Sequence, residues 1–309
     1  METQTILWVS FFVAIIGVAT PLLLAATGEL VVEKSGVLNL GMEGMMLIGA
    51  VVAFAVAYSS GSHILGILSA LFASAIAALL FGYLTITLTS NQVATGLALT
   101  LFGTGFSSLL GEPFVGKTIA QVGAVFPSFL AEHPYLRLVF GHSAYVYFSL
   151  FMLILVSFFL RKTRKGLILR AVGESDSSAH SIGYSVAVVR YMAVAFGGAM
   201  AGIAGSYFSL VLTPLWAEQL TGGRGWIALA LVVFASWKPG RLLLGAYLFG
   251  IVMTLELYLK ASGLRLVPPE LLAALPYLAT IAVLVLISMR KSGYSAAPAC
   301  LAKPFKPSH

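Results

Sequence analysis

The sequence predicts an all-α membrane protein, a single polytopic bundle of about nine (eight to ten) transmembrane helices. Of the 309 residues, 59% are hydrophobic and only 9% are charged, and the mean hydropathy is +0.98. An average soluble domain carries about 25% charged residues, so this composition excludes a soluble globular protein. The apolar runs are continuous rather than alternating with a period of two, which disfavours a transmembrane barrel.

Each predicted helix corresponds to an apolar run of roughly the 20 residues that a membrane span needs. The runs are residues 5–26, 37–58, 64–86, 93–110, 144–160, 191–212, 226–237, 242–259 and 271–289. The first run lacks the basic region of a secretory signal and is expected to be an uncleaved span, kinked at Pro21. In the sixth run, the spacing of Gly198 and Gly202 predicts close packing between helix backbones.

The segments between the runs complete a single transmembrane domain, residues 1–290. Residues 28–36 are predicted to form a short polar loop. Residues 111–143 contain three prolines and are expected to form a loop with a short re-entrant or amphipathic piece. The tail, residues 291–309, carries prolines and cations and is predicted to be disordered.

The distribution of positive charge predicts the orientation in the membrane. With the N-terminus outside and the C-terminus inside, most of the 18 Lys and Arg residues fall on the inner side, as cytoplasmic loops require. Residues 161–190 and the tail are then cytoplasmic. This bias accounts for the formal charge of +7 without nucleic-acid binding. Cys300 is the only cysteine, so an intramolecular disulfide and a cysteine metal site are excluded.

One stretch matches a nucleotide-binding motif in letters only. GEPFVGKT, Gly111–Thr118, fits the phosphate-loop pattern. That pattern binds phosphate when a strand precedes the loop and a helix follows it. Here an apolar span precedes it, Pro113 interrupts it, and its predicted face is external. Lys117 is therefore not predicted to bind a nucleotide.

Polar residues inside the spans are candidates for a translocation pathway, because a carboxylate at mid-membrane costs about 2.5–3.5 kcal/mol on insertion scales. Glu43 and Asn39 are expected on one helix face, four residues apart, and Gly41 and Gly44 could loosen that helix. The pair could line or gate a pathway. Alternatively, Glu43 could hydrogen-bond a neighbouring helix end or pair with Lys34.

Asn91, Gln92 and Thr95 are expected at the inner mouth of the fourth span. They could line the vestibule through which a solute leaves, or Asn91 could cap the helix. Arg224 could face an external partner, or it could pair with Glu218.

Four stretches resemble the inner-membrane permeases of ATP-binding-cassette (ABC) importers. They are SGVLNLGMEGMMLIGA (35–50), NQVATGLALTLFGTG (91–105), RAVGESDSSAHSIG (170–183) and GGRGWIALALVVFASWKP (222–239). Their order and spacing match the simple-sugar and nucleoside uptake group, which is related to the branched-chain amino-acid permeases, over roughly residues 20–289. The second and fourth stretches look more like the nucleoside branch than the ribose branch.

The resemblance implies a transport subunit without an ATPase or cofactor of its own, located in the bacterial inner (plasma) membrane. ATP would be bound by two partner cassette ATPases. The other implied partners are a second permease subunit, identical or different, and an extracytoplasmic substrate-binding protein. By the same resemblance, transport is inward, by alternating access.

The resemblance also implies that residues 161–190 contain a coupling helix, which docks on the ATPase. Gly173 is expected to break the incoming helix, Glu174, Ser175 and Asp176 to offer capping oxygens, and Gly183 to end the coupling helix. The basic run 161–165 is expected to lie at lipid headgroups.

The residues predicted to carry the coupling are Arg170, Gly173, Glu174, Asp176, Ser177, His180, Ile182 and Gly183. The family's N-P-x-A-A-like run is replaced by residues 176–180 here, so the docking register stays open. Without the resemblance, a solvated, membrane-anchoring loop would be preferred.

Two other functions compete with this one. A stand-alone secondary carrier would be expected to hold ion-coupling carboxylates in opposed repeats, and an enzyme to hold a clustered catalytic set; neither is visible, and the histidines are dispersed. Within ABC permeases, a branched-chain amino acid is the alternative substrate.

Overall fold

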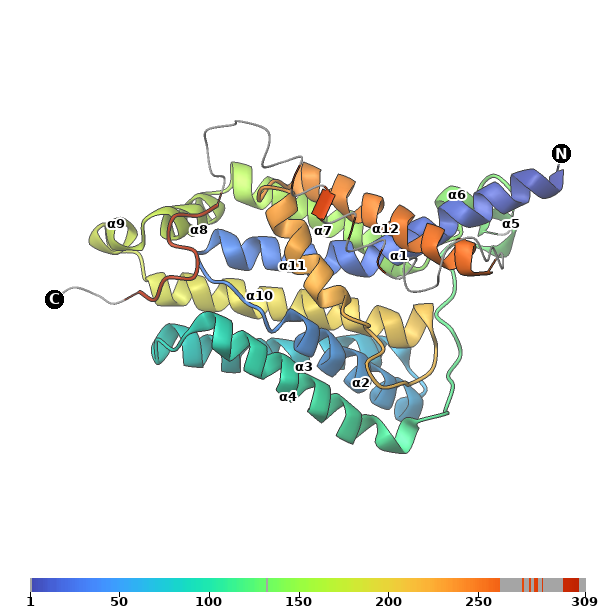
Figure 1. Cartoon of the computed structure of the whole chain (residues 1–309), viewed down its shortest axis with the longest axis horizontal. Coiled ribbons are helices and arrows are strands. Elements are labelled where there is room, and N and C mark those ends of the chain that lie inside the picture. Colours follow the sequence, from blue (N-terminus) through green and yellow to red (C-terminus); the bar gives the residue numbers. More distant parts are fainter. Residues whose placement is uncertain are drawn as a thin grey trace.

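The apolar runs fold into long helices that lie side by side along the long axis of the molecule (Figure 1). The computed structural model describes residues 2–131, 133–261 and 297–305, with a few single positions between the last two ranges. Seven helical segments in these ranges are long and apolar enough to cross a membrane. They confirm that the chain is an all-helical, multi-pass membrane protein.

Short elements join the long helices. The helices are α1 (Glu2–Lys34), α2 (Met42–Ser60), α3 (His63–Gly82), α4 (Gln92–Gly111), α5 (Ser128–Ala131), α6 (Arg137–Phe140), α7 (Ala144–Lys162), α8 (Arg164–Glu174), α9 (Asp176–Ser181), α10 (Val186–Tyr207), α11 (Arg224–Phe234) and α12 (Pro239–Ala261). Single π or 3-10 turns, η1 (Tyr83–Thr87), η2 (Glu112–Phe114) and η3 (Phe208–Leu212), continue α3, α4 and α10.

The predicted count of about nine spans is not reached in the described part. The predicted seventh run forms α11, which has 11 residues and is therefore about 17 Å long at 1.5 Å per residue, well short of the roughly 30 Å hydrocarbon core. It starts after Gly223, at φ 80°, and lies oblique to the long helices (Figure 1). The predicted ninth run, residues 271–289, lies outside the described ranges apart from single positions.

The predicted polar loop at residues 28–36 is wrong, because α1 continues to Lys34. Its two carboxylates are buried and hydrogen-bonded inside the bundle. Glu29 Oε1 accepts from the Asn39 amide at 3.2 Å, and Glu33 Oε2 accepts from the Trp237 indole at 2.5 Å. Because these donors from outside α1 satisfy the two carboxylates within the bundle, Glu29 and Glu33 can lie inside the helix rather than in a polar loop.

The loop at residues 111–143 contains η2, α5 and α6, each of which has at most four residues. Around the phosphate-loop-like stretch, α4 leads directly into η2, so a helix stands where the motif needs a strand. The Lys117 ammonium lies 5.0 Å from the centre of the Tyr58 ring and 5.5 Å from that of Phe114. These contacts give Lys117 a cation–π role.

Small residues let the central helices α2, α3 and α10 approach each other closely. A side chain at Gly198 would meet Ala78 and the Ser74 carbonyl, and one at Gly202 would overlap the Ala70 carbonyl. The close packing predicted from the Gly198 and Gly202 spacing is confirmed, with α3 as the partner.

The same packing predicts a large stability difference between two glycines. A Cβ at Gly205 would overlap the backbone carbonyl of Met46 in α2. We expect Gly205→Ala to destabilise the protein by about 1–3 kcal/mol, as overpacking does, and to lower the melting temperature in detergent. At Gly105 in α4 a Cβ meets nothing within 4 Å, so Gly105→Ala is expected to be neutral or slightly stabilising. Equal melting temperatures for the two variants would contradict the close approach of α10 to α2.

Candidate functional site

The polar segment after α7 forms two short helices at one end of the bundle, with α9 projecting beyond the long helices (Figure 1). The Thr163 hydroxyl caps α8 by accepting from the Gly166 amide at 3.0 Å. The Ser175 hydroxyl caps α9 by accepting from the Ser178 amide at 3.3 Å. Both caps follow the ordinary preference of Ser and Thr for helix N-termini.

The predicted helix break at Gly173 is wrong, because α8 continues through Gly173 to Glu174. A side chain at Gly173 would overlap the carbonyl of Lys34, so the glycine lets α8 pack against the end of α1. The break lies at Ser175, where φ is −152° and ψ is 95°. At the other end, Gly183 has φ +94° and follows the last turn of α9, as predicted for the residue that ends this helix.

Arg190 in α10 holds this end of the molecule together. Its side chain is only 1% exposed. It donates to Asp176 Oδ2 at 3.1 Å, to the Ser35 carbonyl at 3.3 Å and to the Lys303 carbonyl at 3.4 Å. A buried guanidinium requires such partners, and here they come from α9, the turn after α1 and the C-terminal segment. In the sequence, Arg190 is only one of the cations of the 161–190 segment. No neighbouring residue predicts that its side chain is buried.

The C-terminal residues 297–305 are folded against α8, α9 and the turn after α1, which differs from the predicted disorder of the tail. The Cys300 amide donates to the Gly173 carbonyl at 2.9 Å, and the Ala302 amide donates to the Gly36 carbonyl at 3.2 Å. The Phe305 ring contacts the His180 ring edge-on, with 5.4 Å between centres. Backbone pairing and one aromatic contact thus order a segment that its composition alone marks as a loop.

Most of the predicted coupling residues lie on one exposed surface. Glu174, Ser177, His180, Ile182 and Gly183 are exposed, and Ile182 is 71% exposed. By contrast, Arg170 and Asp176 are half-buried and Gly173 is buried. We call this exposed set, with the end of α8 and all of α9 beneath it, the α9 surface.

Glu43 hydrogen-bonds a neighbouring helix end, which is one of the alternatives that the sequence left open. Its Oε1 accepts from the Thr221 hydroxyl at 2.5 Å and from the Gly223 amide at 2.8 Å, and its Oε2 accepts from the Gly225 amide at 2.5 Å. A carboxylate at the N-terminus of α11 also meets the positive end of the helix dipole. Whether Glu43 additionally lines a solute path stays a prediction.

Asn39 does not share a helix face with Glu43, because α2 begins only at Met42. The Asn39 side-chain oxygen Oδ1 accepts from the Gly41 amide at 3.0 Å, a local bond that competes with the helix. Gly41 and Gly44 serve packing: a side chain at either would clash with Leu99 of α4. The non-helical backbone runs from residue 35 to residue 41 and includes Gly41, whereas Gly44 lies within α2.

The predicted inner-mouth residues lie together at the start of α4. Asn91 caps the helix by accepting from the Ala94 amide at 3.0 Å, Gln92 is buried and accepts from the Leu38 amide at 2.8 Å, and the Thr95 hydroxyl lies 2.9 Å from that of Ser90. A cavity of about 300 Å³ is lined by Thr89, Ser90, Asn91, Gln92, Val93, Ala302 and Pro304. The C-terminal segment therefore contacts α9 and also lines this cavity.

Arg224 follows the capped turn and does not form the predicted pair with Glu218. Its guanidinium donates to the Thr221 carbonyl at 3.3 Å and stacks 5.0 Å over the Phe208 ring. Both partners are local to the junction between η3 and α11, so Arg224 fixes this junction.

Comparison with known proteins identifies the family. A family described as the permease component of branched-chain amino acid transport systems matches residues 11–284. A protein of Haloferax volcanii named as a glucose ABC transporter permease is 41% identical over 293 residues, covering 88% of this chain and 89% of its own. The guanosine ABC transporter permease of Bacillus subtilis is 30% identical over 283 residues, covering 86% and 88% of the two chains. The nucleoside ABC transporter permease of Lactococcus lactis is 29% identical over 281 residues, covering 87% and 89%. Matches of this extent, on a bundle of spanning helices, show that the chain belongs to the family of ABC transporter permeases that includes the branched-chain amino acid permease components.

Proposed function

We propose that this chain is the membrane-spanning permease subunit of an ABC importer for a simple sugar or a nucleoside. It takes its power from cassette ATPases through the α9 surface and moves solute by alternating access, together with a second permease subunit and an extracytoplasmic binding protein. The N-terminus is outside, and the α9 surface with the C-terminal segment is cytoplasmic. The names of the three relatives support a sugar or nucleoside rather than a branched-chain amino acid.

The observation that carries the proposal is how firmly the projecting α9 is tied to the bundle. A surface that transmits force must move with the spanning helices rather than bend away from them. The Asp176–Arg190 ion pair joins α9 to α10, and the glycine contact at Gly173 joins α8 to α1. A push on the α9 surface therefore reaches two spanning helices directly.

The test is coupled transport in vesicles that contain this chain, its ATPases and its second permease, with the binding protein outside. Radiolabelled guanosine or glucose should enter only when ATP is inside. In the proposed complex, Glu174→Gln would remove one charge-assisted contact between the α9 surface and the ATPase, worth about 1.5–3 kcal/mol, and should lower the solute carried per ATP by about tenfold. The melting temperature should stay unchanged because Glu174 is exposed.

The matched control is Glu112→Gln, which alters an exposed acid of η2 after the far end of α4. It should leave coupling intact. Uptake by this chain without any ATPase would overturn the proposal, and so would protease or label access to residues 174–183 from the outside only.

A further inference from the structure

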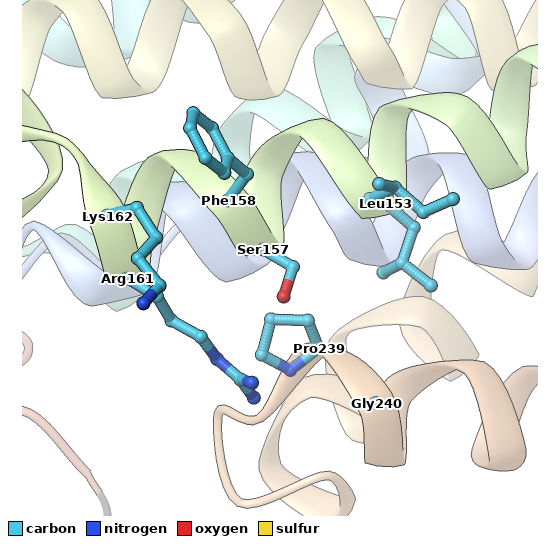
Figure 2. A pocket seen from close by; sticks show the side chains of 8 residues that line it. Leu153, Ser157, Phe158, Arg161, Lys162, Pro239 and Gly240 are labelled. Atoms are coloured by element: carbon cyan, nitrogen blue, oxygen red, sulfur yellow. The ribbon is translucent and has the colours of Figure 1, made fainter.

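We propose that the groove between the end of α7 and the start of α12 is a binding site for one anionic phospholipid. The groove has a volume of about 390 Å³ and is lined by Leu153, Ile154, Ser157, Phe158, Arg161, Lys162, Pro239 and Gly240. Figure 2 shows Arg161 extending from α7 toward the start of α12, with Ser157 pointing at Pro239. The proposal does not depend on which solute is carried.

The groove lies at the depth of lipid headgroups. The candidate span of α7 ends at Lys162, and that of α12 begins at Pro239. Both cations of the groove therefore stand where two spans meet the membrane surface at the same end of the molecule. A basic pocket between helices at this level is the usual arrangement for an anionic headgroup.

In the part of the chain that the structure describes, neither cation forms a salt bridge. Within the described ranges, the salt bridges are Arg190–Asp176 and Lys260–Glu256, so Arg161 and Lys162 are not neutralised by a carboxylate there. Both side chains are exposed, as is the neighbouring Lys238. The groove thus presents a concentrated positive charge that a phosphodiester would balance.

The walls of the groove favour a lipid over a free anion. Below the cations, Ile154 is 68% exposed and Phe158 is 57% exposed on α7. Gly240 opens the opposite wall, because a Cβ there meets nothing within 4 Å. A ligand that satisfies both halves of the groove needs a negative head and an apolar chain. Inorganic phosphate lacks the chain, and a zwitterionic lipid lacks the net charge.

The experiment measures lipid binding to the purified full-length chain in detergent by native mass spectrometry. The probes are dioleoylphosphatidylglycerol, dioleoylphosphatidylcholine and inorganic phosphate. We expect the anionic lipid to bind at least fivefold more tightly than the zwitterionic one, and phosphate at millimolar concentration not to displace it. Each basic side chain near a membrane surface contributes about fivefold in affinity. The double variant Arg161→Gln/Lys162→Gln should therefore lose about 25-fold in affinity for the anionic lipid.

The matched control is Arg164→Gln/Lys165→Gln, which removes the same charge at the start of α8, outside the groove. It should retain the preference. Gly240→Leu fills the groove without changing charge and should weaken binding of both lipids.

Three outcomes would overturn the site. One is equal binding of the two lipids, and another is an equal loss in the two charge variants. The third is a shift of Gly240→Leu from dimer to monomer in size-exclusion chromatography, because that would make the groove an interface between copies.

Discussion

Replacing Glu43 with alanine should lower the free energy of unfolding by about 4 kcal/mol. The carboxylate receives three hydrogen bonds, from Thr221, Gly223 and Gly225. Hydrogen bonds to a charged group contribute about 1.5–3 kcal/mol each, and such contributions are not additive. The loss also leaves two backbone amides at the start of α11 without an acceptor. Thermal unfolding in detergent, followed by circular dichroism, measures the effect.

The glutamine variant separates a structural role of Glu43 from a role in the solute path. Glutamine has one acceptor oxygen, so whichever way the amide is turned, the Gly223 or the Gly225 amide loses its partner. Glu43→Gln should therefore be destabilised by less than the alanine variant. If uptake falls only as far as folded protein falls, the role is structural. If uptake disappears while the melting temperature is retained, Glu43 lines the path.

Glu256→Gln is the control for removing an acid from a spanning helix. Glu256 pairs with Lys260 at 2.6 Å, and the lysine side chain is 39% exposed. Exposed pairs contribute about 0–1 kcal/mol, so this variant should melt close to the parent protein. A drop as large as that of Glu43→Ala would contradict the capping account.

Replacing Arg190 with methionine should release both α9 and the C-terminal segment. Removing one partner of a buried ion pair costs about 3–5 kcal/mol, and Asp176, the Ser35 carbonyl and the Lys303 carbonyl would each lose a donor. Hydrogen exchange should rise by at least tenfold at residues 176–183 and 298–305, while exchange in the middle of α10 stays slow. In vesicles, ATP hydrolysis should continue with little uptake.

Asp176→Asn provides the milder companion to Arg190→Met. The amide oxygen can still accept from Arg190, so the position of α9 should be kept and only the charge of the pair is lost. Slow exchange in both segments is expected, with a smaller loss of coupling. If Arg190→Met leaves exchange at residues 176–183 unchanged, Arg190 does not hold α9.

The sequence was sufficient for the seven long helices of the described ranges but not for their ends. Apolar runs predict the long spans because burial in lipid requires about 20 apolar residues whatever the partners are. The end of α1 depends instead on Trp237, which lies 204 residues away from Glu33. The neighbouring sequence does not show that the Glu33 carboxylate has a donor elsewhere in the chain. From the sequence alone, this charged residue therefore predicts a loop.

In the candidate site too, features that depend on neighbouring residues were predicted, and features that depend on distant residues were not. The capping of α9 and its end at Gly183 depend on neighbours in sequence, and they follow from propensity. Gly173 looks like a helix breaker, but its role is to meet the Lys34 carbonyl, which only the fold brings near. Likewise, the run at residues 226–237 is apolar enough for a span, but the left-handed turn at Gly223 and the positive φ values at Ser236 and Trp237 set the length of α11.

The docked C-terminal segment bears on how the protein is made. Lys303 supplies a carbonyl to Arg190, which lies 113 residues earlier in the chain, and it is synthesised after all of the described spanning helices. The Arg190 guanidinium therefore gains its third acceptor only after the described spanning helices have been synthesised. A chain truncated just before residue 297 would keep all the described spanning helices but would lack the Lys303 carbonyl that Arg190 contacts, so the defect would lie around α9 rather than in the spanning bundle.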